Sequence, residues 1–93
     1  MAYVSMAGKT YVGQIGADVD EKIPGLKKIA DAIKNRGSVP VLQLSFGGRI
    51  AQTAAVLHDD VIGPSDVPGH QPGMATPRPM TDAEIPQSIA DFG

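Results

Sequence analysis

The sequence predicts an α/β fold organised around one helix followed directly by one buried strand. Apolar residues recur at intervals of three and four through residues 20–36, which is the spacing of one helix face, whereas residues 39–45 are apolar on both alternating faces. A strand that is apolar on both faces is typical of a parallel sheet covered on both sides. With 93 residues and 42% hydrophobic content, the chain can form one small domain at most.

The helix predicted over residues 20–36 has a marked beginning and a marked end. Asp20 stands where an N-cap is expected, and Gly37 follows the last turn as a left-handed stop. Pro24 lacks an N–H, so we expect the regular helix to begin a residue or two after the cap. The apolar face of the helix consists of Ile23, Leu26, Ile29, Ala30 and Ile33.

The strand predicted over residues 39–45 contains one polar residue, Gln43, between Leu42 and Leu44. A buried amide without partners costs about 1–3 kcal/mol, so Gln43 must either bond to neighbouring backbone or face a polar ligand. Pro40 is compatible with the start of a strand, where a missing N–H is tolerated. Gln43 is therefore the candidate binding residue of this strand.

The segments around this helix and strand are predicted to be mostly loop. Residues 1–19 mix single β-forming residues with glycines, which indicates loop with room for a short strand or hairpin. Residues 46–80 are predicted to be one long loop, because prolines and glycines are frequent from position 63 onward and exclude regular helix or central strand. Within that loop, residues 50–57 are rich in alanine and are compatible with two helical turns.

A second helix is predicted over residues 81–92. It begins with a capping box, in which the Thr81 hydroxyl and the Glu84 carboxylate satisfy each other's backbone donors. An alternative interpretation makes Asp82 and Glu84 a general acid and base, but acids in a first turn are explained by capping and by the helix dipole. We therefore interpret these acids as structural.

Three short motifs resemble binding sites, and for each we favour a structural interpretation. The GKT of residues 8–10 lacks the earlier glycine of a phosphate-binding loop, because Tyr3 occupies that position. The FGG of residues 46–48 allows a sharp turn, which Arg49 is expected to hold through backbone carbonyls or a carboxylate. The HDD of residues 58–60 looks like a metal-ligand cluster, but adjacent residues on an exposed loop do not converge on one ion.

Composition excludes several classes of function. The chain contains no Cys, so it forms no disulfide or thiolate metal site, and this is compatible with the reducing cytoplasm in which we expect the protein. A net charge of −2 gives no reason to expect a nucleic-acid partner. No apolar run approaches the ~20 residues that a membrane helix needs, so no membrane association is expected.

Four blocks of the sequence, taken together, resemble the NADH:flavin oxidoreductase family of old yellow enzyme. The blocks are DEKIPGLKKIADAI, VLQLSFGGR, VIGPSDV and TPRPMTDAEI, and they occur in the family's order at similar spacing. The resemblance runs from Tyr3 to Phe92. It implies an incomplete fragment of a (β/α)8 TIM barrel, with the second helix, the third strand, a long lid loop and the start of the third helix. An intact barrel typically needs about 200 residues or more.

The resemblance also implies an FMN-dependent enzyme that takes hydride from NAD(P)H and reduces an activated alkene or a similar small-molecule acceptor. The family places a glutamine of the third strand against the pyrimidine edge of the flavin, and Gln43 matches that position. An amide both donates and accepts hydrogen bonds, as that ring edge requires. The family usually has a histidine and a small residue where Phe46 and Gly47 stand, and we interpret these two residues as structural.

The family's other site residues come later in its sequence, so we expect this chain to be inactive in isolation. A lone strand leaves backbone N–H and C=O groups unpaired on both edges. We therefore expect the chain to associate with the remainder of the barrel or with copies of itself. The alternative function is that of a non-catalytic piece, truncated or engineered, that acts only by association.

Overall fold

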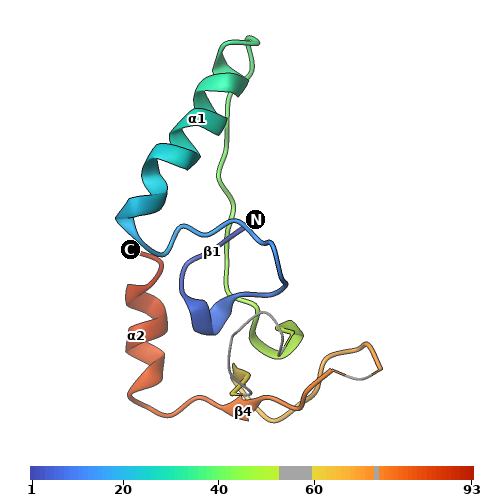
Figure 1. The fold of residues 1–93 in the computed structure, drawn as a ribbon. Coiled ribbons are helices and arrows are strands. Elements are labelled where there is room, and N and C mark those ends of the chain that lie inside the picture. The colour runs from blue at the N-terminus through green and yellow to red at the C-terminus, as the bar shows by residue number, and fades with distance from the viewer. Residues whose placement is uncertain (53–59, 73) are drawn as a thin grey trace.

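A computed structural model describes residues 1–52, 60–72 and 74–93 of the chain (Figure 1). The described residues extend over 44 × 30 × 20 Å with a radius of gyration of 14.8 Å, whereas a compact domain of this length has about 12–13 Å. Much of the chain therefore lies away from a core. The strands are β1 (Ala2–Tyr3), β2 (Leu44–Ser45), β3 (Ile62–Gly63) and β4 (Arg78–Pro79), and the helices are α1 (Ile23–Lys34) and α2 (Glu84–Ala90).

β1, α1 and β2 form one parallel strand–helix–strand unit. Ala2 lies opposite Leu44 and Tyr3 lies opposite Ser45, and the Ala2 N–H donates to the carbonyl of Gln43 at 2.8 Å. Parallel strands cannot be joined by a tight turn, and the crossover through α1 supplies the longer connection that they need. The expectation of a lone strand is thus corrected, because β2 has a partner in the N-terminal residues.

Residues 1–19, predicted to be loop with room for a short strand, contain β1 at their start. β1 is bonded on both edges, because the Tyr3 N–H donates to the Ile15 carbonyl at 3.0 Å and the Ala17 N–H donates to the Tyr3 carbonyl at 2.8 Å. The second edge forms an isolated parallel bridge between Tyr3 and Gly16. β1 is accordingly buried, with Ala2 and Tyr3 only 0% and 5% exposed.

The helix predicted over residues 20–36 is present as α1, preceded by a single 3-10 turn at Asp20–Lys22. Pro24 lies in the first turn of α1, where its missing N–H has no intrahelical partner to lose. Among the residues that the structure describes, no side chain caps either the 3-10 turn or α1. The predicted capping role of Asp20 is therefore wrong, because the chain continues through the 3-10 turn into α1 and Asp20 lies inside it.

α1 ends as the sequence predicts, at a left-handed glycine. Gly37 has a φ of 80°, and the Ser38 N–H reaches back to the carbonyl of Ile33 at 3.3 Å. These are the features of a Schellman motif, which satisfies the last carbonyls of a helix. The chain turns sharply at this point and returns alongside α1 as an extended segment (Figure 1).

The strand predicted over residues 39–45 is regular only at its end, where β2 meets β1. Before that, residues 39–42 form the extended segment, in which Val39 and Val41 are 85% and 87% exposed. β1 is only two residues long, so it pairs with the end of the segment and not with its beginning. Sheet hydrogen bonds need a second strand, and no other described strand lies beside residues 39–42.

The long loop predicted over residues 46–80 contains a second parallel pair, β3 and β4. The Arg78 N–H donates to the Val61 carbonyl at 2.7 Å and the Met80 N–H donates to the Gly63 carbonyl at 2.8 Å. Pro79 is tolerated because the bonding N–H groups come from the residues on either side of it. The prediction of continuous loop is therefore wrong at these residues, whereas the exclusion of a central strand is not contradicted, because β3 and β4 form a sheet of two edge strands. A 3-10 turn also occurs at Gly48–Ile50.

A small core joins this second pair to the turn that follows β2. Ala51 and Val61 are both 2% exposed, and Ala75 packs against them.

The alanine-rich residues 50–57, interpreted as two possible helical turns, lie mostly outside the described residues. α2 occupies the middle of the residues predicted as the second helix, 81–92. Neither described helix has the length and hydropathy required to cross a membrane.

Candidate functional site

The loops that follow β1 and β2 meet at one end of the strand–helix–strand unit. Because the strands are parallel, both loops leave from the same edge, which is where α/β folds usually bind ligands. The Gly47 N–H donates to the Gly8 carbonyl at 2.6 Å, and the Gln52 N–H donates to the Thr10 carbonyl at 2.9 Å. We call residues 4–16 the first loop and residues 46–52 the exit loop.

Gln14 connects the first loop to the end of β2 through its side chain and is only 6% exposed. Its Oε1 accepts a hydrogen bond from the Thr10 N–H at 2.7 Å, and its Nε2 donates to the Ser45 Oγ at 3.1 Å. The Ser45 hydroxyl in turn donates to the Ala2 carbonyl at 3.4 Å. The sequence analysis missed Gln14, because its segment carries neither a periodic pattern nor a known motif.

Gln43, the predicted cofactor-binding residue, lies two positions before Ser45 on the same strand. Its backbone carbonyl is bonded to Ala2, whereas its side chain is exposed and has no hydrogen bond to any described residue. Leu42 lines the groove against α1. Since side chains alternate along a strand, Gln43 and Ser45 project from the face opposite Leu42.

The donor and acceptor groups at this edge are compatible with the pyrimidine ring of a flavin. The Gln43 amide offers one donor and one acceptor group, neither bonded within the described residues. The Ser5 hydroxyl, in the first loop, is buried and has no hydrogen-bond partner among the described residues. Within the described residues, the Gln43 amide is therefore available to a ligand.

Phe46 and Gly47 pack the exit loop onto the first loop. A Cβ on Gly8 would lie 2.4 Å from the Phe46 ring, and a Cβ on Gly47 would lie 2.9 Å from the Thr10 hydroxyl. Both are closer than real Cβ contacts, so each glycine permits an approach that a larger residue would prevent. These contacts support the structural interpretation of Phe46 and Gly47.

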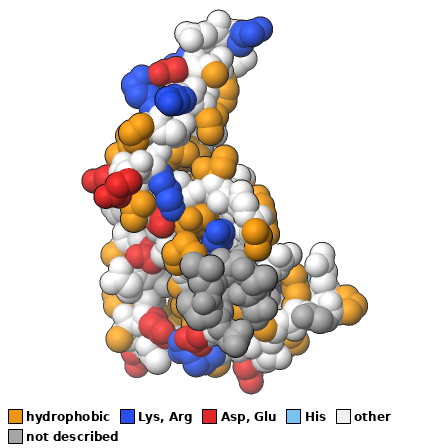
Figure 2. All heavy atoms as spheres, in the orientation of Figure 1, with side chains coloured by type: hydrophobic (Ala, Val, Ile, Leu, Met, Phe, Trp, Pro, Cys, Tyr) orange, Lys and Arg blue, Asp and Glu red, His pale blue; other side chains and the backbone are white. Residues whose placement is uncertain are grey.

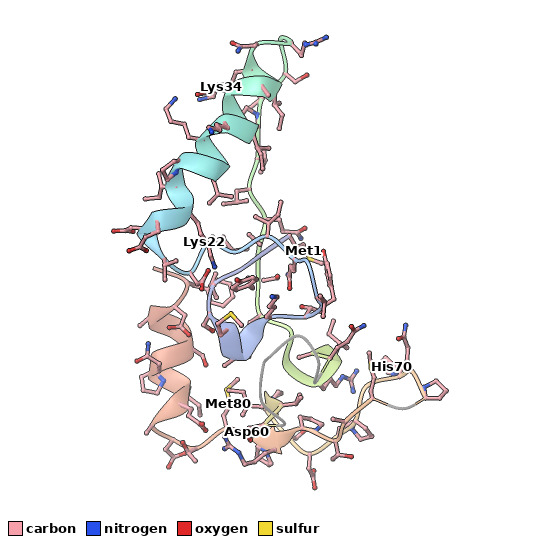
Figure 3. All side chains as sticks on the ribbon, in the orientation of Figure 1. Met1, Lys22, Lys34, Asp60, His70 and Met80 are labelled. Carbon is pink, nitrogen blue, oxygen red and sulfur yellow. The ribbon has the colours of Figure 1, made fainter. Side chains whose placement is uncertain are left out.

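A second polar cluster fixes the start of α1 to the end of β1. The Lys22 ammonium donates to the Tyr3 hydroxyl at 2.8 Å and forms an ion pair with Asp18. The bonds to Asp18 and then to Tyr3 raise the pKa of Lys22 above its usual value. Figure 3 shows Lys22 pointing from the start of α1 toward β1. A Cβ on Gly16 would lie within 2.6 Å of all three side chains, so this position also requires glycine.

A third cluster connects β4 to the start of α2 and contains the predicted capping box. The Thr81 N–H donates to the Glu84 carboxylate at 2.7 Å, which is one half of that motif. The Thr81 hydroxyl donates to the same carboxylate at 3.0 Å instead of accepting from the Glu84 backbone, so the other half is not formed. Asp82 has no part in the cluster, and no described contact supports acid–base chemistry by Asp82 and Glu84.

Arg78 occupies the centre of this third cluster. It binds both carboxylate oxygens of Asp60 at 2.8 Å and both oxygens of Glu84 at 2.8 and 3.0 Å. Arg78 first, and then Thr81, lower the pKa of Glu84 to about 2. The two carboxylates raise the pKa of Arg78 further above its already high value. A guanidinium with four such bonds is a structural cross-link between the segment before β3, β4 and α2.

The remaining predicted motifs contribute little to this edge. Arg49 was expected to hold its turn through carbonyls or a carboxylate, but its Nη2 lies 2.9 Å from the Nε2 of His70, so that expectation is wrong. The HDD motif lies outside the described residues except for Asp60. Among the described residues, no group of His, Asp and Glu is arranged to hold a metal ion.

An apolar groove of about 390 Å³ runs between α1 and residues 40–42. Figure 2 shows hydrophobic side chains along the side of α1 that faces this segment, with charged side chains on its other side. Ile23, Ile29 and Leu42 are 55%, 48% and 53% exposed. The helix face that the sequence marks for packing is therefore only partly covered by the described residues.

The structure thus defines an α/β protein with a polar edge at the ends of two parallel strands. The whole chain, residues 1–93, matches the NADH:flavin oxidoreductase / NADH oxidase family. The chain belongs to that family, as the four sequence blocks indicated.

Individual relatives agree with this assignment. The chain is 38% identical over 91 residues to an NADH:fumarate oxidoreductase of Klebsiella pneumoniae, covering 98% of this chain and 10% of the relative. It is 38% identical over 92 residues to a probable NADH-dependent flavin oxidoreductase, YqiG, of Bacillus subtilis, covering 99% of this chain and 24% of the relative. Among solved structures it resembles a 2-naphthoyl-CoA reductase with a TM-score of 0.85 and 29% identity, covering 97% of this chain and 15% of that one. The chain spans a quarter or less of the length of each.

Proposed function

We propose that this chain is the part of an FMN-dependent, cytoplasmic NAD(P)H oxidoreductase that contributes Gln43 to the flavin site, within a (β/α)8 barrel. The acceptor would be an activated alkene or a similar small molecule. Family membership supports flavin and NADH dependence. The observation that supports the role of Gln43 most directly is its exposed amide, which has no hydrogen bond within the described residues and projects from the face opposite α1.

The contribution of the chain to the reaction would be to bind and orient. Bound FMN supplies the hydride-transfer chemistry. The Gln43 amide would donate to one group of the pyrimidine edge and accept from its neighbour, which fixes the rotation of the ring in its plane. The two interlocked loops would hold β2 in place beneath that contact, so that little ordering remains to be done when the cofactor binds.

The proposed function can be tested by transplanting the chain into a relative of full length. In the graft, this chain replaces the 92 matching residues of the B. subtilis protein. We expect the purified graft to be yellow, to retain FMN through gel filtration and to oxidise NADH when an activated alkene is added. A well-folded graft without flavin, judged by its circular dichroism against the parent protein, would contradict the proposal.

A second candidate function is association alone, and the apolar groove favours it. The exposed face of α1 and the unpaired edge of residues 39–42 are surfaces that further barrel strands and helices, or a second copy of the chain, would cover. Light scattering and circular dichroism on the separate chain test this candidate. Oligomers, or a chain that orders only when the rest of the barrel is added, would support it, whereas a monomer that melts cooperatively would contradict it.

A further inference from the structure

Gln14 is a buried polar residue that the proposed function does not use. Its amide lies between the first loop and the end of β2, with Thr10 on one side and Ser45 on the other. The bond to the Thr10 N–H requires an acceptor and therefore orients Oε1 toward the first loop, which leaves Nε2 to donate to Ser45. A side chain that is 6% exposed cannot turn to water for these bonds, so the amide is fixed in one orientation.

Through Ser45, Gln14 acts on the strand that carries Gln43. Ser45 follows Gln43 by two positions, and residues two apart on a strand share one face. Ser45 is bonded to both Gln14 and the carbonyl of Ala2, and the Ala2 N–H is bonded to the carbonyl of Gln43. A chain of hydrogen bonds thus runs from the first loop through Gln14 and Ser45 to Ala2 in β1, and from Ala2 to the backbone carbonyl of Gln43.

The same amide also supports the contact between the two loops. Thr10 donates its N–H to Gln14 and accepts from the Gln52 N–H with its carbonyl at 2.9 Å. An apolar residue at position 14 would leave the Thr10 N–H and the Ser45 hydroxyl without these partners in a poorly hydrated place. Losing the amide would therefore loosen the exit loop as well as the strand end.

We propose that Gln14 is a positioning residue for the cofactor contact, holding the end of β2 so that the Gln43 amide is presented in one fixed orientation. This inference rests on the proposed function of Gln43. Gln14 does not itself touch the cofactor, since both ends of its amide are already bonded to protein.

The first test needs no cofactor. Amide hydrogen exchange is measured, without FMN, on the graft and on its Gln14→Met variant, which keeps the size of the side chain and removes both bonds. We expect the Gly47 and Gln52 amides to exchange about 3- to 10-fold faster in the variant, because the first loop, which carries their acceptors, loses its bond to the end of β2. The Asn35 amide, bonded within α1, is the internal control. Unchanged exchange at Gly47 and Gln52 would overturn the inference.

The second test is a double-mutant cycle on FMN affinity in the graft. We expect Gln14→Met to weaken FMN binding about 3- to 10-fold, and to add much less when Gln43→Leu is already present. Ser45→Ala, a smaller change at the other end of the bond, should reproduce most of the Gln14→Met effect. Gln71→Met, at an exposed glutamine of the long loop, should have no effect.

The outcomes of the cycle separate the two proposals. If the effects of Gln14→Met and Gln43→Leu multiply fully, Gln14 acts on stability and not through Gln43, and the inference is wrong. If Gln43→Leu leaves FMN affinity unchanged, the proposed role of Gln43 fails, and the positioning role of Gln14 fails with it. The faster exchange in Gln14→Met would then show only a structural connection between the loops.

Discussion

The two sides of the strand–helix–strand unit differ in how far the chain completes them. At the ends of β1 and β2, backbone groups of the two loops bond to one another, and the buried Gln14 connects the first loop to the end of β2. Along α1 and residues 39–42, apolar side chains stay exposed around a groove, and no described strand pairs with residues 39–42. The difference shows that local polar contacts organise the edge that carries the candidate site, whereas the apolar side needs a covering partner.

The largest effect on stability is expected where the two loops are in closest contact. Gly8→Ala places a Cβ 2.4 Å from the Phe46 ring, so the ring or the loop must move. We expect the free energy of unfolding of the graft to fall by about 1–3 kcal/mol, as for other overpacked positions. Urea unfolding followed by circular dichroism measures it. An unchanged midpoint would mean that the two loops are in loose contact, and that this edge is packed no more closely than the apolar side.

The Arg78 cluster gives a smaller effect that depends on pH. The pKa of Glu84 is lowered to about 2 in the folded chain, against about 4.3 for an unperturbed glutamate. The stabilisation from this group is therefore complete above about pH 4.3 and is lost as the pH falls through about 2. Carboxyl NMR titration should show Glu84 ionising near the lower value, and Arg78→Ala should return its pKa toward the usual range. An ordinary pKa in the unmodified chain would contradict the cluster.

The smallest effect is expected on the open side of the unit. Gly25 lies in α1, and a Cβ there would meet nothing within 4 Å. Gly25→Ala should raise the free energy of unfolding of the graft by about 0.5–1 kcal/mol, because alanine has the higher helix propensity. Gly25→Ala and Gly8→Ala both add one methyl group to a glycine, so their effects on the free energy of unfolding can be compared directly. Destabilisation by Gly25→Ala would contradict the view that this position of α1 is open.

The sequence predicted the elements whose signal is local. Helical periodicity located α1, and the glycine at position 37 marked its end, because both depend on residues within one turn of each other. The same reasoning could not find β1 or the pair of β3 with β4, because two-residue strands are defined by distant partners and not by their own pattern. It also predicted a strand over residues 39–45, although the described chain supplies a pairing strand only for the last two of these residues.

The candidate site was predictable only in part, for a similar reason. Gln43 stood out as one amide in an apolar run. Gln14 lies in a stretch without periodicity, and its role depends on a bond to Ser45, 31 positions later. Contacts of such long sequence separation follow from the parallel crossover and from the packing of the loops, which composition and spacing do not specify.

The most direct test of the central claim, that Gln43 holds the flavin ring, is the FMN dissociation constant of the graft carrying Gln43→Leu. Gln71→Leu at an exposed loop position serves as the matched control. Loss of the amide bonds should weaken FMN binding by about tenfold or more in the first variant and leave it unchanged in the second. Equal affinity in the two variants would contradict the account.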